Sequence, residues 1–372
     1  MKKIRVGIIG QGRSGRDIHR HLFHTQPSLL ERFEVVAVAD PIAERCEPFA
    51  NAPADYKRYA DYKDMLNDST LGLDLVVVAC RSAAHMDVSI EVMEHGFNCI
   101  CEKPACRTVA ELDRALAVAE KTGKFFLIYQ QSRFRTLFTK MVEVMKSGKL
   151  GEIQMVKVAY NGFGRRWDWQ TIQDMCAGEL LNTGPHPLDQ IVAMWEMFGG
   201  DEKPETIFSK LAGVNVSGDA EDFVKLVISG KGHPVFDMEC VKCNHYNPYT
   251  YQVYGSNGSL AASGDTLEWQ YFNAAKTPAI PEVKVATLEG AGRLPTYCAE
   301  KLNITKESYT ISAYEAGVDF WGVCYYEEVY NALVNGAETT VKMRQVRRQI
   351  EIIEECHRQN PLPKTVAVPG KL

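Results

Sequence analysis

A short segment in the middle of the chain, GELLNTGPHPLDQ (residues 178–190), places an amide, an imidazole and a carboxylate close together at Asn182, His186 and Asp189. Its two prolines suit the first turn of a helix, so we expect a helix to begin here and run through LDQIVAMWEMF. Residues three apart share a helix face, so we expect His186 and Asp189 to point the same way, with Asn182 on that side just upstream.

These three groups suit proton transfer and hydroxyl binding. An imidazole has an ordinary pKa of about 6.5, so we expect His186 to act as a general base. Asp189 would hold a second substrate hydroxyl or orient His186, and Asn182 would hydrogen-bond a hydroxyl without titrating. The alternative is a structural histidine and aspartate at the start of a helix.

A lysine after an apolar run is the next candidate for chemistry. In CEKP, Glu102, Lys103 and Pro104 follow a strand-like segment. Ligands of open α/β sheets bind at the carboxyl ends of strands, so Lys103 is expected to face a ligand. Its ammonium could bind a substrate hydroxyl and stabilise negative charge on that oxygen. A solvated surface lysine is the alternative, which the apolar strand and the rigid proline disfavour.

A glycine motif precedes these residues near the start of the chain. GIIGQGRSG has Gly10, Gly12 and Gly15 in the G-x-G-x-x-G spacing, directly after a strand and before a helix. The three glycines suit a tight turn, close approach of a diphosphate, and close helix packing, respectively. Free amides at the helix start then bind the diphosphate. A glycine turn without a ligand is the alternative.

Asp40 ends the next apolar strand, in VVAVADP. A carboxylate there accepts hydrogen bonds from both ribose hydroxyls and repels a 2′-phosphate, so NAD is favoured over NADP. Arg45 lies close to Asp40 in sequence and could bind a 2′-phosphate, so NADP is the alternative cofactor. A second alternative is an aspartate that only caps the following helix.

The elements around these residues change character along the chain. Short apolar strands alternate with helical patterns at first, one of them VAELDRALAVAEKTG with a Thr108 cap, Glu111 and a stop at Gly123. This indicates a parallel sheet covered on both faces. Later strands alternate apolar and polar residues and are joined by Gly, Asn and Pro turns, and two helices follow. We expect an α/β protein: a doubly wound Rossmann domain over 1–125, an α+β domain with a largely antiparallel open sheet over 126–358, and a tail over 359–372.

Composition excludes several classes of protein. The 372 residues are 45% hydrophobic with a net charge of -5, which suits two globular domains. Lysines and arginines are scattered, so a nucleic acid is not an expected partner. The apolar run in MKKIRVGIIG is too short for a signal sequence, and no segment approaches the roughly 20 apolar residues of a membrane span. We expect a cytoplasmic protein with no membrane partner.

The eleven cysteines lie mostly in apolar strand-like segments and are expected to be reduced thiols. CVKCNH, with Cys240, Cys243 and His245, has a metal-like spacing. Since no second cluster accompanies it, cysteines of a strand are favoured over a zinc site, and no metal is expected.

Taken together, GQGRSG, AD after the second strand, EKP and GELLNTGPHPLDQ resemble the Gfo/Idh/MocA family of glucose-fructose oxidoreductase and inositol dehydrogenase relatives, over essentially the whole chain. The resemblance implies a Rossmann domain, NAD or NADP as cofactor, and a C-terminal sheet that serves as a homo-oligomer interface. The family's lysine falls on Lys103, and its D-x-G-x-H-x-x-D pattern falls on Asn182, Gly184, His186 and Asp189. Asn182 stands where many members have Asp, and CRSAAH before His85 departs from a Thr-Pro-Asn-type turn.

Further residues are expected at the substrate and cofactor. In FGRRWDWQ, an indole can stack on a sugar face, although exposed aromatics also pack between subunits. Arg133, after the strand KFFLIYQ, could also face the substrate, whereas His19, His21 and His24 are expected to be surface or packing residues. The substrate-binding candidates are Arg133, Arg166, Trp167, Trp169 and Asp189. The cofactor-binding candidates are Gly10, Gln11, Gly12, Arg13, Ser14, Gly15, Asp40, Cys80, Arg81, His85, Glu102 and Lys103.

We therefore expect an NAD-dependent oxidoreductase that acts on a secondary hydroxyl of a sugar, glycoside or cyclitol. One alternative is an enzyme that cleaves glycosides through a keto-sugar, with tightly bound NAD used transiently. The other is an NAD-binding regulator without catalysis, since a fold alone does not fix a function.

Overall fold

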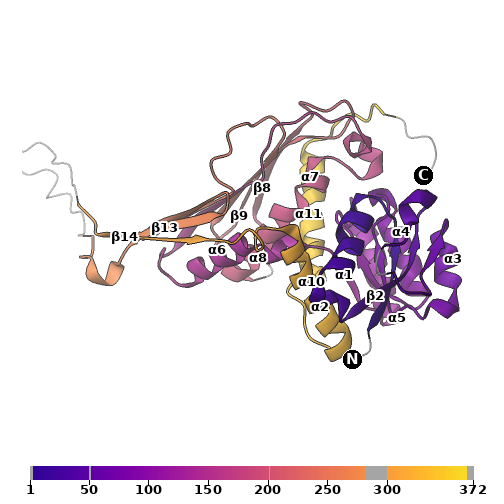
Figure 1. Cartoon of the computed structure of the whole chain (residues 1–372). Helices are drawn as coiled ribbons and strands as arrows, with labels where there is room; N and C mark the ends of the chain where they lie inside the picture. Colours follow the sequence, from indigo (N-terminus) through magenta and orange to yellow (C-terminus); the bar gives the residue numbers. More distant parts are fainter. Residues whose placement is uncertain (1–2, 50–51, 201, 281–299, 367–372) are drawn as a thin grey trace, which may run out of the picture.

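The computed structural model describes residues 3–49, 52–200, 202–280 and 300–366. An N-terminal α/β unit stands beside a large second sheet, and the two C-terminal helices lie between them (Figure 1). The predicted fold class is confirmed.

The first sheet has six parallel strands in the order β3-β2-β1-β4-β5-β6. Its central strands are rich in valine and isoleucine and almost wholly buried, as expected for strands covered on both faces. The short edge strand β3 has partly exposed side chains and no apolar pattern, so the sequence does not reveal it. The strands are β1 (Ile4–Ile9), β2 (Phe33–Ala39), β3 (Lys57–Tyr59), β4 (Leu75–Val78), β5 (Asn98–Cys101) and β6 (Phe126–Ile128).

The helices of this unit follow local signals in the sequence. α5 (Val109–Thr122) begins at the predicted capping box of Thr108 and Glu111 and ends at Gly123, which adopts the left-handed conformation. After the glycine motif, a single π-helical turn, η1 (Gly15–Arg20), continues into α1. The remaining helices are α1 (His21–Thr25), α2 (Pro27–Leu30), α3 (Tyr62–Asn67) and α4 (His85–Glu94).

The second sheet has eight strands in the order β14-β13-β12-β11-β7-β10-β9-β8, and β7 with β10 is its parallel pair. A largely antiparallel sheet was the expectation and is confirmed. β14 is polar and mostly exposed, so the sequence does not predict it. The strands are β7 (Ile153–Ala159), β8 (Thr206–Ala212), β9 (Phe223–Ser229), β10 (Val235–Val241), β11 (Tyr251–Gly255), β12 (Gly258–Ser263), β13 (Thr266–Phe272) and β14 (Ile304–Thr310).

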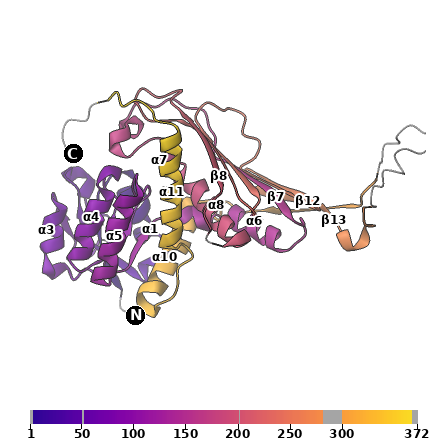
Figure 2. The same cartoon turned by 180° about the vertical axis from the view of Figure 1, so that it is seen from behind.

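The longer helices that pack against this sheet are α6 (Thr136–Lys146), α8 (Pro185–Gly199) and α11 (Met343–Gln359). They lie on the same side of it (Figures 1 and 2). α11 also contacts α5 and β6, while α10 (Val318–Asn335) contacts α1 and α2. α11 therefore joins the second sheet to the N-terminal unit, while α10 packs on the N-terminal unit and on the segment that follows β6.

Two of the expected boundaries need correction. β6 belongs to the first sheet, so that unit extends beyond residue 125. The helices α10 and α11 pack on both units rather than on the second alone. α11 ends at Gln359, where the tail was expected to begin, and residues 367–372 of that tail lie outside the described residues. None of the described helices is long and apolar enough to cross a membrane.

Candidate active site

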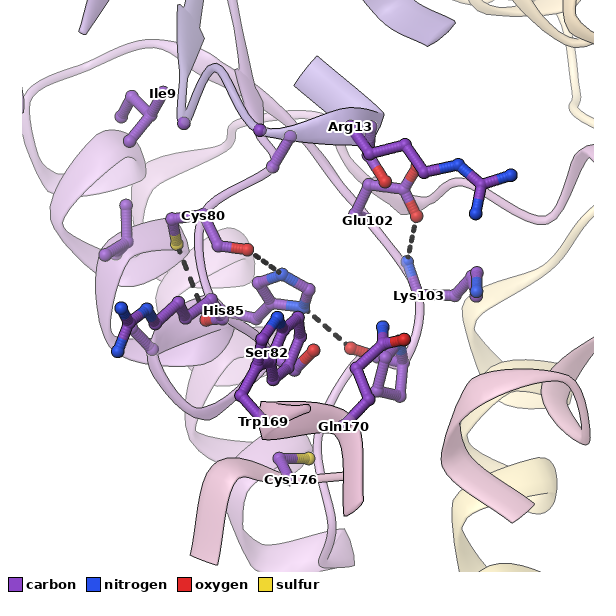
Figure 3. A pocket seen from close by; sticks show the side chains of 18 of the residues that line it. Ile9, Arg13, Cys80, Ser82, His85, Glu102, Lys103, Trp169, Gln170 and Cys176 are labelled. Carbon is purple, nitrogen blue, oxygen red and sulfur yellow. Dashed lines mark hydrogen bonds between the residues drawn. The ribbon is translucent and has the colours of Figure 1, made fainter. Parts of the chain in front are cut away.

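A cavity of about 1000 Å³ lies where the N-terminal unit meets the segment before α8. The first sheet contributes the loops after β1, β2, β4 and β5, as expected for the carboxyl edge of a parallel sheet. The second region contributes the loop around Arg166 and Trp169 and the residues from Cys176 to His186. Figure 3 shows Cys80, His85, Glu102 and Lys103 around this space, with Trp169 and Cys176 approaching from the second region.

The glycine turn after β1 is shaped to admit a ligand. Gly10 has a φ of +86°, and a Cβ there would lie 2.5 Å from the Ala79 carbonyl oxygen. A Cβ on Gly15 would collide with the Gly10 carbonyl, whereas one on Gly12 would meet nothing within 4 Å. Gly10, Gly12, Arg13 and Ser14 line the cavity. The turn thus leaves its backbone open at Gly12, which fits the diphosphate of a dinucleotide.

Two predicted cofactor residues support this turn from behind rather than lining the cavity. Gln11 is fully buried, and its backbone N–H donates to Asp40 Oδ2 at 2.7 Å. Gly15 begins the helix that packs on the turn. Their part in cofactor binding is therefore to hold the loop.

Asp40 lies at the end of β2 and lines the cavity. Its carboxylate accepts hydrogen bonds from the Gln11 amide and, at 2.9 Å, from the Ile42 amide. Arg45 Nη1 lies 3.9 Å from Asp40 Oδ2. The carboxylate is therefore held in a fixed position at the cavity wall, where it could accept hydrogen bonds from a ribose, with one cation nearby.

The turn after β4 closes another wall. Cys80, Arg81 and His85 line the cavity. His85 Nδ1 lies 2.7 Å from the Pro104 carbonyl oxygen and Nε2 lies 3.2 Å from that of Cys80, and burial lowers the pKa of the ring. A neutral ring donates to one of the two oxygens at a time. His85 therefore joins the turn after β4 to the turn after β5.

Lys103 extends from the end of β5 toward the second region. Its Nζ donates to the Asn182 carbonyl oxygen at 2.9 Å, which leaves two N–H groups of the ammonium. Burial lowers the pKa of Lys103, against the opposing effect of the Glu102 and Glu179 carboxylates. The solvated surface lysine that was the alternative is excluded, because Lys103 lines the cavity and is partly buried.

His186 lies in the first turn of α8, which begins at Pro185 as predicted. Its Nδ1 is buried and has no hydrogen-bond partner within the described residues. Burial, together with the charge of Lys103, lowers the pKa of His186 to about 3, so the ring is neutral. Asn182 ends the short helix α7 (Glu179–Asn182) and also lines the cavity. The structure therefore brings Lys103, Asn182 and His186 together.

Asp189 and Arg133 do not join them. The Asp189 carboxylate forms a two-point ion pair with the Arg133 guanidinium, at 2.7 and 2.8 Å, and both side chains are almost fully buried. Neither residue lines the cavity. The predicted contact of Asp189 with substrate or His186 and that of Arg133 with substrate have no geometric support in this structure, because each buried charge is satisfied by the other.

Some of the candidate residues in the loop FGRRWDWQ line the cavity and one does not. Arg166 and Trp169 line the cavity, and Arg166 Nε is held by the Asp168 carboxylate at 2.9 and 3.0 Å. Trp167 is 76% exposed and is not among the lining residues. The substrate role expected for Trp167 therefore has no geometric support in this structure.

Two sequence interpretations concern histidines and cysteines outside the cavity. His19 is not a surface residue: it is fully buried and bonds Glu102 and Tyr326. Cys240 is buried in β10, and His245 stacks on Phe163 with ring centres 3.9 Å apart. The residues that the structure describes contain no group of three His, Cys, Asp or Glu side chains arranged for a metal ion.

Comparison with known proteins places this geometry in a family. The family model for an oxidoreductase family with an NAD-binding Rossmann fold matches residues 4–130, and that for the GFO/IDH/MocA C-terminal domain matches residues 138–261. The scyllo-inositol 2-dehydrogenase (NADP(+)) IolW of Bacillus subtilis is 21% identical over 98% of this chain and 95% of its own length. Inositol 2-dehydrogenase of Salmonella paratyphi B is 29% identical over 46% of this chain and 48% of its own length.

Among solved structures, the WlbA dehydrogenase from Bordetella pertussis, in complex with NADH and UDP-GlcNAcA, covers 98% of this chain and all of its own. Its TM-score is 0.70 at 18% identity, which shows a shared fold. Two family models that together span most of the chain, and a cavity whose glycine turn fits a dinucleotide, lead to one conclusion. The chain belongs to the Gfo/Idh/MocA family of NAD(P)-binding oxidoreductases.

Proposed function

We propose that this protein oxidises a secondary hydroxyl of a sugar, glycoside or cyclitol. The observation that carries the proposal is the convergence of Lys103, Asn182 and His186 on the same cavity as the glycine turn and Asp40. A substrate in contact with the three polar groups would thereby share one enclosed space with the cofactor. The inositol dehydrogenases among the relatives support a polyhydroxylated ring as substrate.

Each of the three residues has a distinct task in this proposal. The bound nicotinamide supplies the acceptor for the substrate's hydride. Lys103 directs its remaining N–H groups at the reacting oxygen and stabilises negative charge there. His186 accepts the hydroxyl proton, because it lines the cavity and its ring is neutral. Asn182 binds a neighbouring hydroxyl, and it carries no charge where many family members have an aspartate.

We further propose that NAD binds in preference to NADP. The Asp40 carboxylate is held by two backbone amides and is only 6% exposed, so it cannot turn away from a 2′-phosphate. Arg45 offsets part of that charge from 3.9 Å, but it is itself half exposed and screened by water.

The test replaces Lys103 by Met, which keeps the length of the side chain and removes its charge. Single-turnover NADH formation is measured with a panel of inositols, free hexoses and glycosides, beside titrations of NAD and NADP. Lys121→Met, on the exposed side of α5, is the matched control. We expect Lys103→Met to bind NAD like the parent and to form NADH roughly a hundredfold more slowly, the cost of one well-placed electrostatic contact.

Parental rates of NADH formation in Lys103→Met would remove the lysine from the chemistry. Equal affinities of the parent for NAD and NADP would contradict the proposal that Asp40 selects NAD. Cleavage of a glycoside with no net NADH release would instead favour transient use of the cofactor.

A further inference from the structure

A chain of buried hydrogen bonds runs from α10 to the backbone of Lys103. Tyr326 OH lies 2.6 Å from His19 Nδ1, and His19 Nε2 lies 3.1 Å from Glu102 Oε1. The second carboxylate oxygen, Glu102 Oε2, accepts the backbone N–H of Lys103 at 2.9 Å. His19 and Tyr326 are fully buried and Glu102 is 3% exposed, so water does not compete for these bonds.

Chemistry fixes the direction of this chain. An ionised carboxylate can only accept, so His19 Nε2 must carry a proton and donate it to Glu102. Burial keeps Tyr326 protonated by raising the pKa of its phenol far above the usual value. The protonated Tyr326 hydroxyl can then donate to Nδ1 of His19. Each polar hydrogen has one acceptor, and the negative charge of the chain resides on Glu102.

That charge is placed to act on Lys103. Burial disfavours the ionised form of Glu102, yet the hydrogen bond from His19 and the charges of His19, Lys103 and His85 lower the pKa of its carboxyl. Lys103 faces Glu102 and Glu179, which favour its ammonium, and Arg13 and Arg166, which oppose it. The charge of Glu102 thus partly offsets the effect of burial on the lysine.

Close helix packing brings Tyr326 to His19. Gly322 lies one turn before Tyr326 on α10, and a Cβ there would collide with Leu22 of α1 and lie 2.8 Å from Tyr129 OH. The edge of the Tyr129 ring also meets His19, with ring centres 4.5 Å apart. A residue larger than glycine at 322 would force Leu22, Tyr129 or α10 itself to shift and so disturb the packing around His19.

We propose that His19, held by Tyr326 of α10, is a positioning residue that orients Glu102 and thereby keeps Lys103 in place and charged. The catalytic end of the Rossmann unit is then completed by a helix contributed from near the end of the chain. The proposal rests on the proposed role of Lys103, so its test is made on the free protein, without substrate.

The experiment measures the titration of Lys103 directly. Proteins are treated with isotope-labelled acetic anhydride from pH 7 to 11, and acetylation of Lys103 is quantified by mass spectrometry of its peptide. Only the neutral amine reacts, so the midpoint reports the pKa of the lysine. The variants are His19→Phe, which removes both hydrogen bonds, Tyr326→Phe, which removes one, and His19→Gln, whose amide can still donate to Glu102.

Tyr325→Phe is the matched control. Tyr325 is the adjacent residue on α10 and is 1% exposed, but its hydroxyl bonds the Ile128 carbonyl oxygen and not His19. Thermal unfolding and NAD binding are recorded for every variant, so a loss of fold is separated from a change in titration.

We expect His19→Phe to lower the midpoint of Lys103 by about one pH unit, because a buried Glu102 without its donor takes up a proton and no longer favours the ammonium. Tyr326→Phe and Gly322→Ala should lower the Lys103 midpoint by a smaller amount. His19→Gln should give a midpoint close to that of the parent, and Tyr325→Phe should leave the midpoint unchanged. If folded His19→Phe and Tyr326→Phe titrate like the parent, the chain is only packing and the proposal is wrong. A parental titration together with no detectable dehydrogenation would count against both proposals, whereas a shifted titration without dehydrogenation would count against the proposed function alone.

Discussion

His186 shows how strongly burial affects a single residue of the site. Its ring lies against Lys103 and has an unpaired Nδ1, and its pKa falls to about 3. A ring with so low a pKa stays neutral throughout the physiological range, so its unprotonated form is present at every working pH. The cost appears in stability, since the unfolded chain can protonate this histidine and the folded protein cannot.

This linkage predicts a pH dependence of stability. The folded pKa of about 3 lies below the unfolded value of 6.5, so between these values the unfolded state binds the extra proton. The free energy of unfolding must therefore fall as the pH drops from about 6.5 toward 3. Between pH 7 and 4 we expect the parent to lose about 3 kcal/mol more than His186→Asn.

Urea unfolding at the two pH values measures the difference. His95→Asn is the control, because His95 is exposed at the end of α4. Equal losses in parent and His186→Asn would show that His186 is not held neutral by the fold.

At the residue scale, the sequence predicts those site residues that belong to a recognisable motif directly after a strand. Lys103 and the glycine turn follow from that rule, and His186 follows from its place at a helix start. The partners of buried charges do not follow, because Asp189 meets Arg133 and His19 meets Tyr326 across large separations in the chain. The one signal in the sequence is that His19 follows Gly15 by four residues, which would place both residues on the helix side that faces the glycine turn.

At the scale of elements, the buried ion pair joins two segments. Arg133 lies in η5 (Gln131–Phe134), Asp189 lies in α8, and Arg133 also donates to Gln345 of α11 at 3.1 Å. The helices themselves are predicted by local signals, such as the Thr108 capping box and Pro185. The sequence does not predict how α8 is rotated about its axis. Most of its sides are buried, so tertiary contacts decide which of its residues faces the cavity.

The pair predicts a large effect of removing one partner. Arg133→Met leaves the Asp189 carboxylate buried without a counter-charge, so we expect it to destabilise the protein by about 3–5 kcal/mol. The double variant Arg133→Met with Asp189→Leu should recover most of this loss. Arg114→Met, which breaks an exposed pair with Asp87, should cost no more than about 1 kcal/mol.

Chemical denaturation of the four proteins makes the comparison. A loss for Arg133→Met no larger than that of Arg114→Met would mean that Asp189 is satisfied by another group or by water.

At the scale of the whole molecule, α11 joins the two sheets, and α10 packs on the helices α1 and α2 of the N-terminal unit. The sequence predicts both helices and the change from parallel to antiparallel strands. Their return to the N-terminal unit is not predictable from periodicity, which shows that a helix has a buried side but not what covers it. The polar strand β14 escapes prediction for a related reason, as it adds to a sheet edge through backbone hydrogen bonds.

The second sheet has one face covered by α6, α8 and α11 and an opposite face on which side chains are partly exposed. On that opposite face, Phe208 of β8 is 56% exposed and pairs with Val227 of β9. Asp237 and Lys157 continue the row on β10 and β7. A mixture of apolar and oppositely charged residues on one flat surface is suited to contact with a second copy of the chain.

We therefore propose that the protein forms a homodimer through this face of the second sheet. Val227→Arg places a long charged side chain in the middle of the row, between Phe208 and Asp237, and should shift the protein to monomer because its bulk disrupts the contact and its guanidinium would have to lose water there. Ala117→Arg introduces the same side chain on the exposed side of α5 and should leave the assembly unchanged. Size-exclusion chromatography with light scattering, run from about 1 to 100 µM, reports the mass directly. A parent that is monomeric at the highest concentration would show that the protein forms no homodimer in this range. A Val227→Arg variant that keeps the parental mass would show that this face of the sheet is not the contact.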